Sequence, residues 1–148
     1  MRDLKLEKDL RLLSLLMDSW KKLHDFITYA LDRAKPIISA DQERQFTETR
    51  SILLQETEHI LMELNLITEL SGKAMNVLQR ASSLRTVREL AGDDTRRLES
   101  DWNLVFTKLG LLQGQLKARR KALLGRTVLG HALARMFGRG VETGAVSR

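Results

Sequence analysis

Glu56 and His59 are three residues apart, the Glu-x-x-His spacing with which helical bundles hold pairs of iron or manganese ions. Residues at this spacing lie on the same face of a helix, so both side chains can reach one ion. A complete centre needs a second Glu-x-x-His pair and two further glutamates from neighbouring helices. Neither of the other two histidines, His24 and His131, has an acidic residue three positions before it. We therefore expect no metal centre, and we interpret Glu56 and His59 as solvent-exposed residues of a helix face.

Other catalytic chemistry is poorly represented in the chain. The sequence has no cysteine, which excludes disulfides, cysteine-ligated metals and cysteine nucleophiles. It also has no phosphate-binding glycine-rich loop, no nucleophile elbow and no pair of catalytic carboxylates in a recognisable context. The sequence thus predicts a protein that is not an enzyme and that holds no cofactor. A metal-dependent enzyme centred on Glu56 and His59 is the least favoured alternative.

Three ring-bearing residues fall within apolar heptads. His24 could act as a pH switch or a buried ligand, but we favour a histidine in a peripheral layer of a bundle, with its ring nitrogens hydrogen-bonded. Trp20 and Trp102 lie on the same stripes as aliphatic residues, which predicts that they pack in the core.

Gly110 and Gly114 have GxxxG spacing. In a helix that does not cross a membrane, this spacing favours close approach of a neighbouring helix rather than the dimer contact of membrane helices.

The charge of the chain is concentrated at its C-terminal end. Residues 1–116 contain 17 Lys and Arg against 18 Asp and Glu, whereas residues 117–148 contain eight against one. An apolar helical face, formed by residues from Val128 to Phe137, coincides with this basic end. The predicted partner-binding residues combine this face with its cations, and they are Arg119, Arg120, Lys121, Arg126, Leu129, Leu133, Arg135, Met136, Phe137 and Arg139.

Several partners would suit such a segment. Its apolar face could dock on this chain's own bundle or on a second copy, it could lie on an anionic membrane surface, or it could enter a groove of another protein. Nucleic acid is the least favoured partner, because no aromatic residues are interleaved with the charges and no helix-turn-helix pattern is present.

Heptads indicate the helices that must position these residues. Leu6, Leu13, Trp20, Ile27 and Ala34 recur every seven residues, and Pro36 should stop this first helix. A capping box at Ser39 and Gln42 should start the second helix. The heptad of the second helix continues to residue 81, and Gly72 is expected to weaken or bend this helix. The second heptad consists of Phe46, Leu53, Ile60, Ile67, Ala74 and Ala81.

A short helix and a third long helix follow. Ser82 and Ser83 predict a break, after which a short helix should reach Leu90. Gly92 is predicted to end the short helix, and Asp93 is predicted to cap the start of the third long helix. The core stripe of the third long helix should lose its apolar character near residues 117–121, and Gly125 is a candidate hinge. That stripe consists of Leu98, Trp102, Val105, Leu109, Leu112, Leu116 and Leu123.

The sequence therefore predicts an all-α fold, an antiparallel bundle of three long helices plus a short fourth helical element, with coiled-coil-like heptad packing. We expect a bundle over 1–123, a short basic amphipathic helix over 124–138 and a flexible tail over 139–148. Four further apolar residues widen the stripe of the first helix, and they are Leu12, Leu16, Leu23 and Ala30. Wide apolar stripes leave flanks that three helices do not cover, which favours self-association. The expected function is that of a non-enzymatic interaction or scaffolding protein, with peripheral binding to an anionic membrane as an alternative.

Charged residues recur from Arg2 to Arg11, where a signal peptide would need an apolar stretch. No run of apolar residues approaches the ~18 of a membrane-spanning helix. We therefore expect a cytoplasmic protein.

Overall fold

The computed structural model describes residues 3–35, 37–64 and 69–146. Within these ranges every regular element is a helix, which confirms the predicted all-α class. The helices are α1 (Leu4–Leu31), α2 (Ala40–Glu63), α3 (Glu69–Arg80), α4 (Leu84–Arg88) and α5 (Gly92–Val146).

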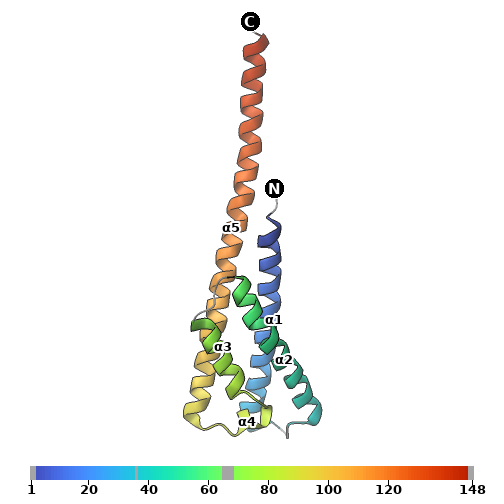
Figure 1. The fold of residues 1–148 in the computed structure, drawn as a ribbon, viewed down its shortest axis with the longest axis vertical. Coiled ribbons are helices and arrows are strands. Elements are labelled where there is room, and N and C mark those ends of the chain that lie inside the picture. The colour runs from blue at the N-terminus through green and yellow to red at the C-terminus, as the bar shows by residue number, and fades with distance from the viewer. Residues whose placement is uncertain (1–2, 36, 65–68, 147–148) are drawn as a thin grey trace.

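The longer helices form an antiparallel bundle. Helix α1 packs against α2 and α5, and α3 also packs against α2 and α5, so that these contacts close a ring. Successive helices of the ring run in opposite directions, and α4 crosses the base of the bundle, where it contacts α1 (Figure 1). The C-terminal part of α5 continues well beyond the other helices (Figure 1).

The predicted capping box starts α2. The Ser39 hydroxyl accepts a hydrogen bond from the Gln42 backbone N–H at 3.1 Å, and the Gln42 side chain accepts one from the Ser39 N–H at 2.8 Å. The stop predicted at Pro36 lies outside the described residues, and α1 ends before it, at Leu31.

The Ser39→Ala substitution is expected to lower the free energy of unfolding by about 1 kcal/mol. Alanine removes the acceptor for the Gln42 N–H, which would be left unpaired at the first turn of α2. Urea unfolding followed by circular dichroism measures the change, with Ser51→Ala, an exposed serine inside α2, as the control. An equal effect at the two serines would show that the capping box contributes nothing.

The second predicted helix is divided in two, which corrects the expectation of one helix bent at Gly72. Helix α2 ends at Glu63, whereas Gly72 lies inside α3. One helix over 40–81 would be about 63 Å long, against about 42 Å for α1, and much of it would have no neighbour. The reversal instead lets α3 pack against both α2 and α5. Ile67 of the predicted stripe lies outside the described residues.

Many residues of the predicted heptads are buried, but Ala34 of the first heptad is exposed, because α1 ends before it at Leu31. The side chains of Leu53, Ile60 and Leu109 are 0%, 3% and 0% exposed. Trp20 and Trp102 are both buried, and the Trp102 indole N–H donates a hydrogen bond to the Trp20 carbonyl oxygen at 3.0 Å. The two tryptophans are thus packing residues, as predicted, and their hydrogen bond joins α1 to α5.

Helix α5 is continuous, which differs from the hinge predicted at Gly125 and from the flexible tail predicted from residue 139. The helix runs through Gly125 and ends at Val146. A glycine inside a helix costs about 1 kcal/mol relative to alanine, and the neighbouring Ala122, Leu124 and Arg126 are strong helix formers. Gly125 alone therefore does not interrupt the backbone hydrogen bonds.

The short helix α4 confirms the break predicted at Ser82 and Ser83. The Ser83 hydroxyl accepts a hydrogen bond from the Thr86 N–H at 3.0 Å and so caps this helix. The Arg88 Nε atom donates to the Ala30 carbonyl oxygen at 2.8 Å, near the C-terminal end of α1. These contacts fix the chain at the base of the bundle, from which α5 begins.

Candidate interaction surface

The Glu56 and His59 side chains are exposed on α2, as predicted. The His59 Nε2 atom lies 3.3 Å from a carboxylate oxygen of Glu63, one turn further along the same helix. Among the described residues no three His, Asp or Glu side chains are grouped so that they could hold a metal ion. His24, His59 and His131 lie on three different helices and do not converge on one site.

His24 occupies a peripheral layer of the bundle. Its Nε2 atom lies 3.1 Å from a carboxylate oxygen of Glu99, and its ring stacks on Trp102 with 4.0 Å between centroids. Trp102 in turn stacks on Phe106 at 4.9 Å. This arrangement matches the hydrogen-bonded peripheral histidine that the sequence favoured, and it ties α1 to α5.

The burial of α5 ends where its charge becomes basic. Leu109 is the last fully buried residue among the described side chains of this helix, and Leu112 and Leu116 are partly buried against the core. Every described side chain between Leu124 and Met136 is exposed. From Leu124 to Met136 the basic end of the chain is therefore a helix that extends from the bundle without packing on it.

The structure places most of the predicted partner-binding residues on this exposed helix. The Arg120 guanidinium is half-buried, with Nη1 3.6 Å from a carboxylate oxygen of Glu7 on α1. The side chains of Phe137 and Arg139 lie outside the described ones. The exposed predicted residues are Arg119, Lys121, Arg126, Leu129, Leu133, Arg135 and Met136.

Docking of this segment on the chain's own bundle, one of the alternatives left open by the sequence, does not occur among the described residues. Val128 and Met136 are each 70% exposed, and Leu129 is 59% exposed. The apolar face is thus unpartnered within the part of the chain that the structure describes.

The exposed apolar face extends back along the bundle, a feature that the sequence reasoning missed. Leu104 and Leu111 are exposed although they lie on the packed part of α5. Each follows a core residue, Trp102 or Leu109, by two positions, and residues two apart point about 200° away from each other around a helix. Helix α5 therefore has a second apolar stripe on the side opposite the bundle, and a second heptad at this offset is the signal that could have revealed it.

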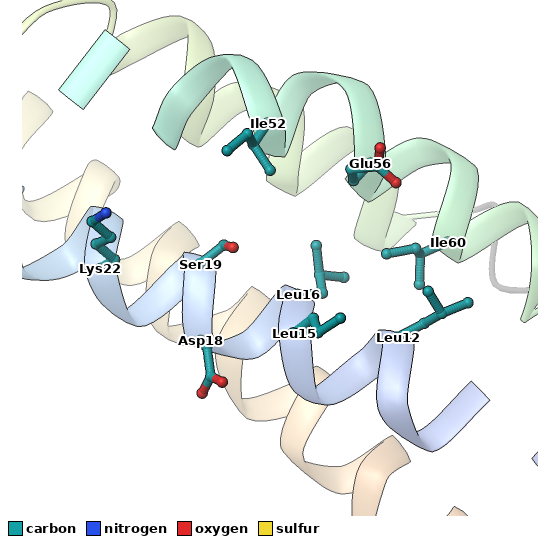
Figure 2. Close-up of a pocket in the computed structure, with 9 residues that line it drawn as sticks. All are labelled: Leu12, Leu15, Leu16, Asp18, Ser19, Lys22, Ile52, Glu56 and Ile60. Carbon is teal, nitrogen blue, oxygen red and sulfur yellow. The ribbon is translucent and has the colours of Figure 1, made fainter. Parts of the chain in front are cut away.

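A separate apolar surface, which does not involve α5, lies between α1 and α2. A groove of about 410 Å³ opens there, and it contains Leu15 and Ile52, which are 58% and 51% exposed. Figure 2 shows Leu12 and Leu16 of α1 facing the isoleucines of α2 across the gap. Charged groups of both signs surround it. The lining residues are Leu12, Leu15, Leu16, Asp18, Ser19, Lys22, Ile52, Glu56 and Ile60.

Comparison with protein-family models, with curated proteins and with solved structures finds no match to this chain. Within the described residues, none of the helices has a stretch that is both long and apolar enough to cross a membrane. Among the described residues, the exposed apolar stripe of α5 and the groove between α1 and α2 are candidate interaction surfaces.

Proposed function

We propose that this chain is a non-enzymatic interaction protein that self-associates through the groove between α1 and α2. The observation that carries the proposal is the exposure of Leu15 and Ile52 inside an apolar groove. Exposed aliphatic side chains that gather in one concave surface gain free energy when a partner removes them from water. The wide apolar stripe predicted for the first helix supports the proposal, since Leu12 and Leu16 of that stripe line the groove.

The charges around the groove suit a second copy of the same chain. In a twofold-symmetric dimer the same patch meets itself, so the patch must be complementary to itself. Lys22 stands on the rim together with Asp18 and Glu56, so a cation of one copy can face a carboxylate of the other. The basic end of α5 lacks this property, because two copies of it would bring like charges together.

Leu15→Asp is expected to convert the self-associated protein to a monomer. The substitution places a carboxylate in the interface of both copies, and an unpaired buried charge costs several kcal/mol, so the dissociation constant should rise by about a hundredfold or more. Sedimentation equilibrium at micromolar concentration measures the change.

Leu111→Asp is the matched control, since it introduces the same charge at an exposed leucine of α5 outside the groove. We expect this variant to associate as the unchanged chain does. A strictly monomeric unchanged chain would exclude self-association, and a loss of association in Leu111→Asp alone would move the interface to α5.

A further inference from the structure

We infer that the outward face of α5, from Leu104 to Met136, binds along an anionic membrane surface, with the bundle on the side away from the lipid. This inference concerns a surface separate from the groove between α1 and α2, and it does not depend on self-association. The outward face is defined by the exposed residues Leu104, Leu111, Ala118, Ala122, Leu129 and Met136.

The positions of these residues keep the face straight along the helix. Eighteen residues make five turns of an α-helix, so residues 18 apart point in the same direction. Leu111 and Leu129 form one such pair, and Ala118 and Met136 form another. The face is about 50 Å long. It lies opposite the core-facing residues of α5, so the bundle does not stand between it and a planar surface.

Exposed cations lie on both sides of the outward face. Lys108 and Arg126 are 18 residues apart and lie at one edge, about 60° around the helix from Leu111 and Leu129. Lys117 and Arg135 are also 18 apart and lie further away on the other side, about 120° from the same two leucines. All four side chains are exposed. An apolar stripe with cations on both sides of it is the arrangement of a helix that lies in the interface of an anionic bilayer.

Acidic residues are missing from this part of the chain. The sequence has no Asp or Glu between Asp101 and Glu142. Among the cations of this stretch, Arg120 forms an ion pair with Glu7 of α1, on the bundle side. The outward face is therefore flanked by cations without neighbouring carboxylates from the same stretch, which favours anionic headgroups and opposes pairing with a second copy of itself.

Nucleic acid would use the same cations but not the apolar residues between them. Binding to phosphates depends on counterion release and gains nothing from Leu129 or Met136. The exposed aliphatic stripe is thus the observation that favours a lipid surface, and this difference supplies the test.

The test is sedimentation of the full-length chain with vesicles of phosphatidylcholine, alone or mixed with phosphatidylserine. We expect binding to the mixed vesicles, little binding to phosphatidylcholine alone, and weaker binding at higher salt. Lys108→Gln with Arg126→Gln should reduce partitioning about 25-fold, since each charge near the surface contributes about fivefold. Leu129→Ser with Met136→Ser should reduce partitioning about tenfold or more, because it removes apolar area that would be buried in the lipid. All four side chains are exposed, so neither variant should unfold the bundle.

Arg44→Gln with Arg85→Gln is the matched control. It removes the same charge from exposed positions on α2 and α4, away from the outward face, and should bind within about twofold of the unchanged chain. If the control lost as much vesicle binding as the outward-face variant, net charge alone would explain the binding, and the inference would be overturned. No binding to the mixed vesicles would also overturn it. Salt-dependent binding to duplex DNA that Leu129→Ser with Met136→Ser leaves intact, without vesicle binding, would instead assign the face to nucleic acid.

Discussion

Replacement of Leu109 by alanine is expected to lower the free energy of unfolding by about 2–5 kcal/mol. Leu109 is fully buried on α5, within the same core as Leu53 of α2 and Ala74 of α3. The substitution removes apolar contacts and leaves a cavity that rigid helices fill only partly. Leu53→Ala is expected to fall in the same range. Urea unfolding monitored by circular dichroism and by tryptophan fluorescence measures both changes.

Leu111→Ala is the matched control for this prediction. Leu111 lies two positions further along the same helix and is 64% exposed, so its loss should change the free energy of unfolding by no more than about 0.5 kcal/mol. If the free energy of unfolding fell strongly in Leu111→Ala and only slightly in Leu109→Ala, the opposite face of α5 would be the one that packs on the bundle. That result would also remove the outward face on which the inference of membrane binding depends.

The core could be predicted from the sequence because heptad spacing selects one face of each helix. Phe46, Leu53 and Ile60 are buried on α2, and Ala74 and Ala81 stay buried although the chain reverses between Glu63 and Glu69. The reversal itself could not be predicted, because the sequence between these two residues contains no glycine or proline. The end of α2 is set by packing against the rest of the bundle, a tertiary effect that local propensity does not contain.

The two exposed apolar surfaces could be predicted only in part. The charge asymmetry predicts the basic end of α5, but a single heptad stripe per helix does not include Leu104 and Leu111. The groove depends on the separation of α1 and α2, so Leu15 and Ile52 carry no signal that distinguishes them from residues of a wider core stripe. The groove therefore depends on how two helices pack, whereas the core-facing positions of a helix follow from its period.

Loss of the Glu43 carboxylate is expected to have the second largest effect on stability. Its two oxygens accept hydrogen bonds from the backbone N–H groups of Leu84, at 3.1 Å, and Arg85, at 2.9 Å. A five-residue helix such as α4 is too short to form without tertiary contacts, so its first turn depends on this residue of α2. Hydrogen bonds to a charged acceptor contribute about 1.5–3 kcal/mol. Glu43→Gln should therefore lower the free energy of unfolding by about that amount, because an amide offers one acceptor oxygen in place of two.

Glu48→Gln, an exposed carboxylate further along α2, serves as the control and should change stability by no more than about 0.5 kcal/mol. Hydrogen exchange at the amides of Leu84 and Arg85 separates a local effect from a global one. Glu43 of α2 binds the first turn of α4, and Arg88 of α4 binds the C-terminal end of α1. We therefore expect Glu43→Gln both to speed exchange at these two amides and to lower the free energy of unfolding. Faster exchange at these amides with unchanged global stability would contradict the prediction, since α4 would then open without weakening the bundle.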